Sequence, residues 1–476
     1  MSLGLFGTLG LAARSLQTQQ LGLEVTGQNL ANVNNPAYAR QRLTITTSPT
    51  IPTPLGPQGT GAEGAAIQQI RSSLIDGQIQ AETSVGSYWD TMQQDLQSVQ
   101  ANLGEQINTQ ATGADGTTST SSQQGISQSL SDLFNAFQSL STDPSSMAER
   151  QVLLQKAQTL ASQFNQVSQQ LGSLSGDLDQ SLQDGVTSAN QLLSDIAGLN
   201  SQITTTELST NGTANDLRDL RQQKIEELSK LTKVDTVEQN DGTVDVSISG
   251  AQLVSGVNVL DSLETYTTSG GQLMVRTQTG GTALTLNSGS MQGTIDARDG
   301  ALATLSNNLD TIASQIITSV NAIHYDGYGL TGTTHADFFT GSDAKTIAVN
   351  TSLTDDPRLI QASGTDGAVG DNQVALALAQ LADQPIAALG NQTISQAYNQ
   401  SVSTLGQSLA SANTQVADQQ VIQNMLQQQR DSISGVSMDE EMTNMLTFQR
   451  AYQASAELIS TIDAMLNTLI SMKTTA

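Results

Sequence analysis

Few side chains in this sequence are suited to catalysis or metal binding. The chain has no cysteine and only two histidines, His324 and His335, which excludes disulfides and thiolate chemistry. Serine and aspartate are abundant enough for a Ser-His-Asp triad, but no nucleophile-elbow motif marks one. No cluster of histidines and carboxylates shows the spacing of a zinc site. We therefore expect both histidines to be structural or surface residues, and we predict no catalytic residue, metal or cofactor.

Two segments match the glycine pattern of dinucleotide-binding loops. They are residues 59–64 (GTGAEG) and 327–332 (GYGLTG). A nucleotide site also needs a preceding strand and a following helix in a βαβ unit. The first segment follows a proline-rich run, and the second is followed by a loop and short strands. Turn formation is therefore the favoured interpretation of both.

A run of three acidic residues, Asp439, Glu440 and Glu441, comes near the C-terminal end. One interpretation is a metal or general-acid site. The favoured one is that they complement the dipole at the start of a last helix. Ser437 would then be the N-cap, and Glu440 its capping-box partner.

Composition excludes several classes of partner. The net charge is −26, from 18 Lys and Arg against 44 Asp and Glu. Nucleic acid and anionic membrane surfaces bind clustered basic residues, which this chain lacks, so neither is an expected partner. No run of about 18 apolar residues predicts a membrane helix. The first residues lack the positive region of a secretory signal peptide, so composition alone would predict a cytoplasmic protein.

Both ends of the chain carry apolar residues at heptad spacing, which is typical of helices that pair side by side. The N-terminal helix should end near Pro36, because proline cannot continue a helix. The C-terminal helix should cover residues 437–472. The two rows are Leu9, Leu16, Leu23 and Leu30 at the N-terminal end, and Met438, Met445, Tyr452, Ile459 and Leu466 at the C-terminal end.

Between the ends, helical patterns alternate with one stretch of short strands. Residues 43–70 read as strand or irregular structure, and residues 109–124 as a mobile Ser/Thr/Gly loop. Asp143-Pro144 resembles a helix start, with Asp143 as N-cap. The turn signal Asn240-Asp241-Gly242 predicts a hairpin, and further strands are expected at 252–260, 272–277 and 282–286. The remaining expected helices cover 72–104, 127–208, 215–231, 298–324, 371–383 and 392–434.

This order predicts a mainly α protein: a long antiparallel helical bundle, or coiled-coil rod, formed by the N- and C-terminal segments, with a small inserted β domain. Segments 9–30 and 445–466 should face each other. Three domains are expected. They are a terminal coiled coil (1–36 plus 437–476), a helical rod with short strands (37–233 plus 296–436), and the β insert (234–295).

The terminal helices carry more apolar surface than one helix pair can bury. Leu3, Phe6 and Leu11 flank the first row, and Leu446, Phe448 and Leu469 flank the second. Such an excess predicts contact with other subunits. The two heptad rows given above are therefore the predicted subunit-packing interface.

Residues 29–41 (NLANVNNPAYARQ) resemble the signature of flagellar axial proteins, the rod, hook and hook-associated family, whose usual form is roughly A-N-x-N-T-P-G-Y-x-R-Q. Residues 440–456 are similar to the C-terminal signature of the same family. Asn35 replaces the usual Thr and Ala37 the usual Gly, so the turn either does not need a positive φ or is strained there. The predicted motif residues are Asn29, Asn32, Asn34, Pro36, Tyr38 and Arg40.

Four further segments resemble the hook-associated members of the family. They are residues 216–221, 293–299, 321–324 and 327–330. The resemblance implies a non-enzymatic subunit that joins hook to filament, with terminal helices that form an inner tube and are disordered before assembly. It also implies an extracellular location, reached by type III export without a cleaved signal peptide.

The implied partners are other copies of the chain, the hook protein, a second hook–filament junction protein and an export chaperone that binds near the C-terminus. Two alternatives stay open. One is another axial protein, either the second junction protein or the hook protein. The other is a secreted adhesin or enzyme on a coiled-coil stalk, with 234–295 as its head.

Overall fold

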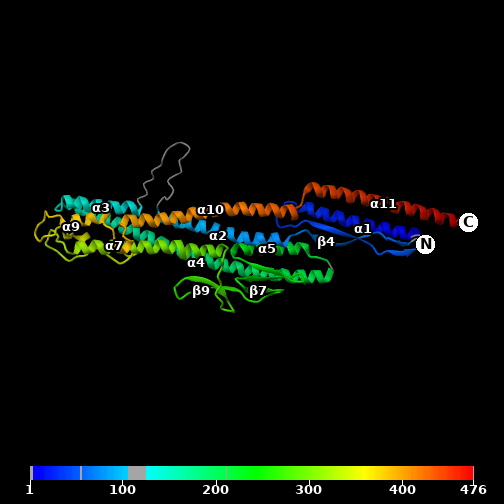
Figure 1. Cartoon of the computed structure of the whole chain (residues 1–476), viewed down its shortest axis with the longest axis horizontal. Coiled ribbons are helices and arrows are strands. Elements are labelled where there is room, and N and C mark those ends of the chain that lie inside the picture. The colour runs from blue at the N-terminus through cyan, green and yellow to red at the C-terminus, as the bar shows by residue number, and fades with distance from the viewer. Residues whose placement is uncertain (1–3, 54–55, 105–124, 211, 475–476) are drawn as a thin grey trace, which may run out of the picture.

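The protein is a long helical rod with both termini at one end (Figure 1). The computed structural model describes residues 4–53, 56–104, 125–210 and 212–474. The predicted loop at 109–124 lies outside them. Within these ranges, no helix is both long enough and apolar enough to span a membrane.

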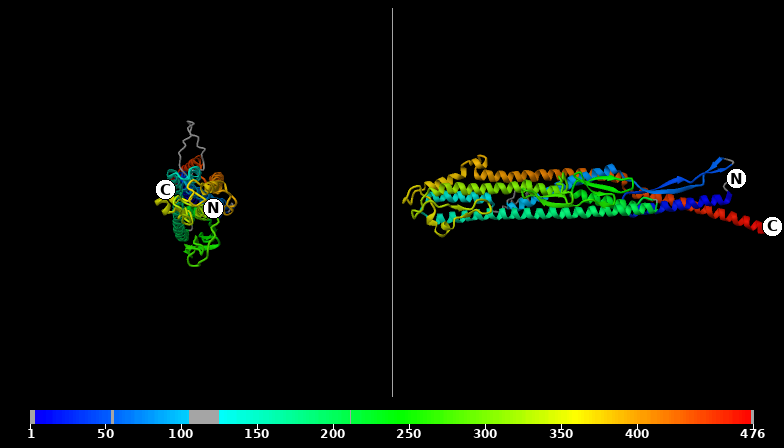
Figure 2. Two further views of the ribbon diagram at one scale, coloured as in Figure 1. Left: turned by 90° about the vertical axis from the view of Figure 1, so that its left-hand side faces the viewer. Right: turned by 90° about the horizontal axis from the view of Figure 1, so that it is seen from below.

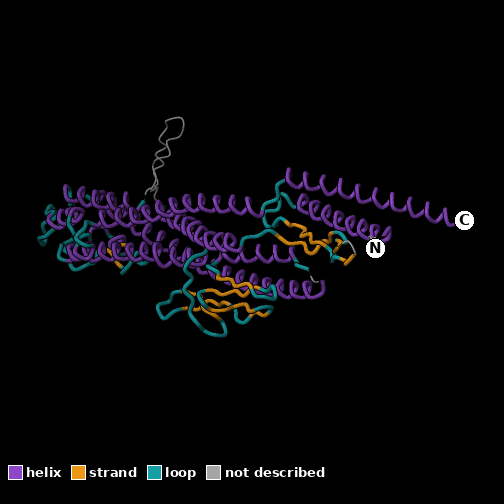
Figure 3. The backbone as a smooth tube through the Cα atoms, turned by 45° about the vertical axis from the view of Figure 1, so that its right-hand side comes forward, coloured by secondary structure: helices purple, strands orange, loops and turns teal. Residues whose placement is uncertain are grey.

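The terminal end of the rod is a helix pair with a strand hairpin beside it. Helix α1 (Gly4–Ala31) packs against α11 (Met438–Thr474), which confirms that segments 9–30 and 445–466 face each other. The antiparallel strands β1 (Gln41–Thr47) and β4 (Ala62–Gln69) contact α1, and the short pair β2 (Ile51–Thr53) and β3 (Gly56–Gln58) extends their hairpin. Figure 3 shows the hairpin alongside the helix pair.

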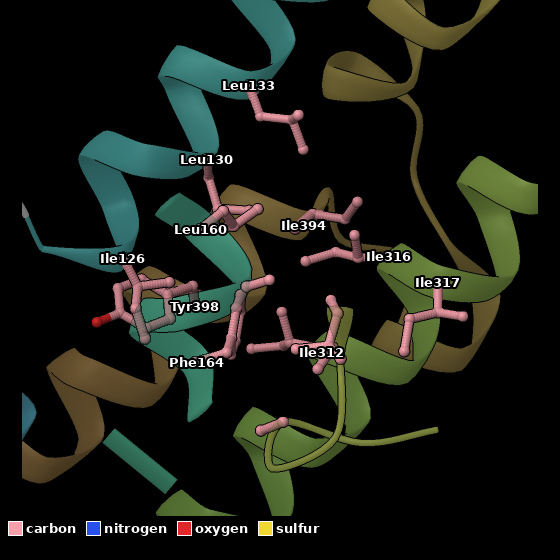
Figure 4. Packing of buried hydrophobic residues seen from close by; sticks show 14 of the residues in the cluster. Ile126, Leu130, Leu133, Leu160, Phe164, Ile312, Ile316, Ile317, Ile394 and Tyr398 are labelled. Atoms are coloured by element: carbon pink, nitrogen blue, oxygen red, sulfur yellow. The ribbon is translucent and has the colours of Figure 1, made fainter. Parts of the chain in front are cut away.

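The body of the rod is a bundle of long helices that the chain builds from both halves. Helix α10 runs antiparallel to α2, since Gln423 reaches Glu82 while Gln93 reaches Asn413. The apolar faces of the bundle helices form one extended core. Figure 4 shows part of this core around Phe164, Ile316 and Tyr398. The bundle helices are α2 (Ser73–Leu103), α3 (Ile126–Thr142), α4 (Met147–Thr210), α7 (Ala303–Tyr325) and α10 (Ile394–Ser434).

The break at Asp143-Pro144 was predicted correctly, but its capping role was not. Asp143 is the C-cap of α3, and α4 begins only at Met147. The hydroxyl of Ser146 accepts the Glu149 amide and so acts at the N-terminus of α4. The physical reason is that Pro144 lies in the turn between the two helices. The backbone amides that need a capping partner are those of the first turn of α4, which begins three residues later.

A small β layer packs on one side of α4 and beside α5 (Asn215–Leu231) (Figure 2). The hairpin of β5 and β6 forms at the predicted turn signal. The sequence missed β9, and the strand expected at 282–286 is reduced to one bridge between Arg276 and Ala283. The strands are β5 (Asp235–Glu238), β6 (Val244–Ile248), β7 (Ala251–Ser255), β8 (Asn258–Val259), β9 (Leu263–Thr267) and β10 (Leu273–Thr277).

The helix after the β layer begins earlier than the sequence indicates. Helix α6 (Ser290–Asp296) leads through a π-helical turn, η1 (Ala297–Leu302), into α7, whereas the prediction began at residue 298. The glycines at 289 and 293 hid this start, because glycine is a poor helix former. The last residues of the range 234–295 are therefore helical.

The distal end of the rod is closed by short elements and turns around α7. They are β11 (Phe339–Thr340), β12 (Ala348–Val349), α8 (Thr351–Asp355), η2 (Pro357–Leu359), α9 (Gln373–Gln380), η3 (Leu381–Asp383) and η4 (Ala387–Leu389). The predicted fold class, a mainly α antiparallel bundle with a small β part, is confirmed. The division into three domains stays a prediction.

Candidate functional site: the paired terminal helices

Helices α1 and α11 pair antiparallel in a regular register. The Ser15 and Ser455 hydroxyl oxygens lie 3.1 Å apart. The Asn29 amide donates to Glu441 at 3.0 Å. Between these two contacts, Gly22 lies directly under the Phe448 ring. The contact residues are spaced seven apart on both helices, so they form one heptad seam.

This seam is not the apolar row that the sequence predicted. Its most buried members include Gly22, Asn29, Glu441, Ser455 and Ile462, most of which are small or polar. Hydrophobic periodicity could not find them. The signal that would have found them is the heptad spacing of small residues, which permits close backbone approach.

The predicted interface residues lie beside this seam. All are partly buried except Met438, which is exposed. On its other side α1 contacts the hairpin, where the Thr18 hydroxyl donates to the Ala62 carbonyl. The prediction of subunit packing through these rows is not tested by a single chain and stays a prediction.

Asn29, the first motif residue, links three elements. Its carbonyl oxygen accepts from the Tyr38 hydroxyl and the Gln41 amide, each at 2.9 Å. Its amide group donates to the Gln41 carbonyl at 2.8 Å and to Glu441. Asn29 is 1% exposed, and these four bonds satisfy its side chain completely. It therefore joins α1, β1 and α11.

Arg40 forms the second connection between the motif and α11. Its guanidinium pairs with Glu440 and Glu441, both at 2.8 Å. The acidic run does lie in the first turn of α11, as predicted. The carboxylate of Glu440, however, binds Arg40 instead of the predicted capping-box partner, Ser437. The two sequence signatures of the axial-protein resemblance are thus in direct contact.

The same motif is also held by the rod. Asp219 of α5 accepts from the Ala39 amide at 3.0 Å and from Arg71 at 3.1 Å. Asp216 accepts from the Gln41 side chain at 2.9 Å. Burial raises the pKa of Asp219 to about 6, against the lowering effect of Ala39 and Arg71. Burial and the neighbouring carboxylates likewise raise the pKa of the Tyr38 hydroxyl.

The remaining motif residues shape the turn after α1. Asn32 donates to the Gln28 carbonyl at 3.0 Å, and Asn34 and Pro36 line a cleft of about 530 Å³ between the motif and the end of α10. Ala37 is not among the described residues with positive φ. Its amide instead donates to the Asn35 side chain at 3.1 Å. The turn therefore does not need the family's usual glycine.

Two of the other family-like segments contain buried polar residues that organise the rod. Arg298 is 4% exposed and binds Asp179, Asp299 and the Leu273 carbonyl, which ties η1 to α4 and β10. His324 is fully buried. Its Nδ1 lies 2.7 Å from the Ala336 carbonyl oxygen, and its Nε2 accepts the Gln361 amide at 3.0 Å. Burial lowers the pKa of His324 to about 4, which favours a neutral ring.

Helix α11 carries many exposed apolar side chains. Phe6 of α1 is also 77% exposed. Single exposed apolar residues are ordinary on a protein surface, but so many on one helix are typical of an interaction site. The exposed apolar residues of α11 are Met438, Met442, Leu446, Leu458, Met465, Leu469, Ile470 and Met472.

Neither glycine-rich segment has the setting of a nucleotide loop. Residues 59–64 run from the β3 side of the hairpin into β4, and residues 327–332 form turns after α7. Within the described ranges, no group of three or more His, Asp or Glu side chains is placed to hold a metal ion.

Comparison with known proteins agrees with these features. Residues 112–339 match the model of the flagellar hook-associated protein FlgK helical domain. Residues 427–472, which contain the end of α10 and most of α11, match the model of the flagellar basal body rod FlgEFG protein C-terminal region.

Full-length relatives and a solved structure are also similar. Flagellar hook-associated protein 1 of Bacillus subtilis is 28% identical over 511 residues, with 98% of each chain covered. The Escherichia coli protein of the same name is 23% identical, with 97% of this chain and 99% of that protein covered. The flagellar hook junction protein FlgK from Burkholderia pseudomallei has the same fold, with a TM-score of 0.64 at 16% identity, over 75% of this chain and 100% of that one.

The paired terminal helices, the signatures that meet at their base and the two family models place the chain among the axial structural proteins of the bacterial flagellum. Within that class, the full-length relatives that it resembles are proteins named flagellar hook-associated protein 1.

Proposed function

We propose that the chain is the subunit that joins hook to filament in its flagellum, and that it assembles by coaxial packing of its terminal helices. It acts as a structural part, without catalysis. The observation that carries the proposal is the α1–α11 pair, whose own seam is filled while many apolar side chains of α11 stay exposed.

The energetics of burial support this mode of assembly. Each large apolar side chain covered by a neighbouring subunit contributes roughly 1.5–3 kcal/mol. Several such residues on one helix supply enough free energy to hold the helix pair in the assembly. The rows Leu9–Leu30 and Met438–Leu466 would then contact neighbouring copies, the hook protein and the second junction protein.

The proposal includes the route to this location. The subunit would be exported by the flagellar type III pathway without a cleaved signal peptide, in company with an export chaperone that covers the exposed apolar residues of α11. A chain without cysteine and with 13% charged residues is compatible with passage through a narrow channel.

Complementation of a strain that lacks the gene tests the proposal. The double variant Leu16→Asp with Leu23→Asp places charge on the terminal helix and should abolish swimming, while filament protein is shed into the medium. The matched control is Leu74→Asp with Leu208→Asp, which changes two leucines of the rod that are 72% and 80% exposed. Normal swimming with the first variant would contradict the proposal, as would equal loss with the control.

A further inference from the structure

The α1–α11 seam contains two contacts that depend on one particular alignment of the helices. One is the apposition of Gly22 and Phe448, and the other is the bond from Asn29 to Glu441 with the ion pair from Arg40. We propose that these two contacts, named the register contacts, determine the register in which the terminal helices pair. The proposal deepens the proposed function, because the register sets how far α11 extends past α1 and so where along the rod its exposed apolar residues meet a neighbouring subunit.

The first register contact is steric. A Cβ atom at position 22 would lie 2.6 Å from the Phe448 ring, closer than side-chain atoms can approach. In its observed rotamer, Phe448 therefore needs a glycine opposite it. One heptad away on α1, the residues at the equivalent position are Ser15 and Asn29, both of which carry a side chain. A slide of one heptad moves the helices by about 10 Å and brings the ring against one of them.

The second register contact is electrostatic. Glu441 is 1% exposed and is bonded to Asn29 and Arg40. After a slide in one direction, Glu441 would face Gly22, which offers no side-chain donor. A buried carboxylate without partners is strongly destabilising. A single buried polar residue fixes the register of coiled coils in the same way, at a cost in stability.

The rest of the seam does not favour one register over another. Ser15 and Ser455 are small and can pair with many neighbours. The apolar residues beside the seam repeat every seven positions, so a slide by one heptad would match them again. Without the register contacts, the helix pair would have several alignments of similar free energy.

The absence of native cysteine makes the register directly measurable in the full chain. Three cysteine pairs are introduced separately, and disulfide formation under mild oxidation is followed by gel mobility and mass spectrometry. Ser15→Cys with Ser455→Cys reports the observed register. Ser15→Cys with Ile462→Cys and Thr8→Cys with Ser455→Cys report slides of one heptad in the two directions.

In the native background, the first pair should form its disulfide on the order of a hundredfold faster than the other two, or more, the ratio that an unpaired buried carboxylate implies. In a Glu441→Ala, Phe448→Ala background, at least one slid pair should rise to within threefold of the first. The matched control background is Met442→Ala with Gln449→Ala, two exposed positions on the same helix, and it should keep the native preference.

Two results would overturn the inference. One is equal disulfide formation by all three pairs in the native background. The other is exclusive formation of the first pair after both register contacts are removed, which would assign the register to the short connection between α10 and α11. The single variant Glu441→Gln, which keeps the shape of the side chain, should give an intermediate ratio. These ratios are measured on the chain alone and do not depend on whether it joins hook to filament. Failure of the proposed function can therefore be told apart from failure of this inference.

Discussion

Replacement of Asn29 by alanine removes all four side-chain hydrogen bonds that join α1 to β1 and α11. Each such bond contributes about 1 kcal/mol net, so we expect the local free energy of opening to fall by about 3–4 kcal/mol. This figure includes the cost of leaving the backbone amide and carbonyl of Gln41 without a partner. The loss should be confined to the terminal end, because the core of the rod is not in contact with Asn29.

Hydrogen exchange of the full chain, read by mass spectrometry, measures this loss. Amides of β1 and of the end of α1 should exchange on the order of a hundredfold faster, which corresponds to about 3 kcal/mol. Amides of α4 and α7 should not change. The matched control is Asn32→Ala in the same motif, whose side chain has one bond to the Gln28 carbonyl. A change of less than threefold for Asn29→Ala, or an equal change for Asn32→Ala, would refute the reasoning.

Three further predictions concern the stability of the rod. Gly289 has φ of +91°, and a Cβ atom there would clash with the backbone of Leu231 and Thr232, so Gly289→Ala should lower the urea midpoint of unfolding strongly. The same change at Gly281, which lies in open space, should cost only about 1 kcal/mol. Because burial lowers the pKa of His324 from 6.5 to about 4, the unfolded chain binds the proton first, so the contribution of His324 to the free energy of unfolding should fall as the pH drops from 6.5 toward 4. The raised pKa of Asp219 acts in the opposite direction over the same window, so the contribution is read as the difference from a His324→Gln variant. A difference that does not change with pH would contradict this. Phe164→Ala should cost about 3–5 kcal/mol in the core, whereas Leu446→Ala at a 53% exposed position should leave the unfolding midpoint unchanged and reduce only assembly.

The helices of this fold were predictable because their apolar residues repeat at helical spacing over long stretches. Leu302, Leu309 and Ile316 form one such row, and all three are buried in the rod. Strands of the β layer were found where a turn signal separated alternating residues, as at 240–242. Strand β9 was missed because its residues, LETYT, carry no such contrast.

The site was only half predictable. The sequence located both terminal helices and the motif between α1 and β1. It placed the contact on leucine rows, whereas the observed seam is made of Ser15, Gly22 and Asn29 against Glu441 and Phe448. Hydrophobic periodicity records where burial is favourable, but close packing of two backbones is favoured by small residues, which such a pattern does not register.

Hydrophobic periodicity also cannot predict polar contacts between residues that are far apart in the sequence. Arg40 and Glu441 lie 401 residues apart in the chain and 2.8 Å apart in the structure. From the sequence, Arg40 was explained as a motif residue, and Glu441 as a carboxylate that complements the dipole of α11. Only the fold shows that they are partners, which is why the acidic run was assigned to the helix terminus alone.

Electron cryomicroscopy of intact flagella from a strain that carries this chain tests the central claim most directly. The account predicts density for the chain in a short zone between hook and filament, with α1 and α11 in the inner tube and the β layer on the outside. Density for the chain along the whole hook or filament, or terminal helices on the outer surface, would contradict it.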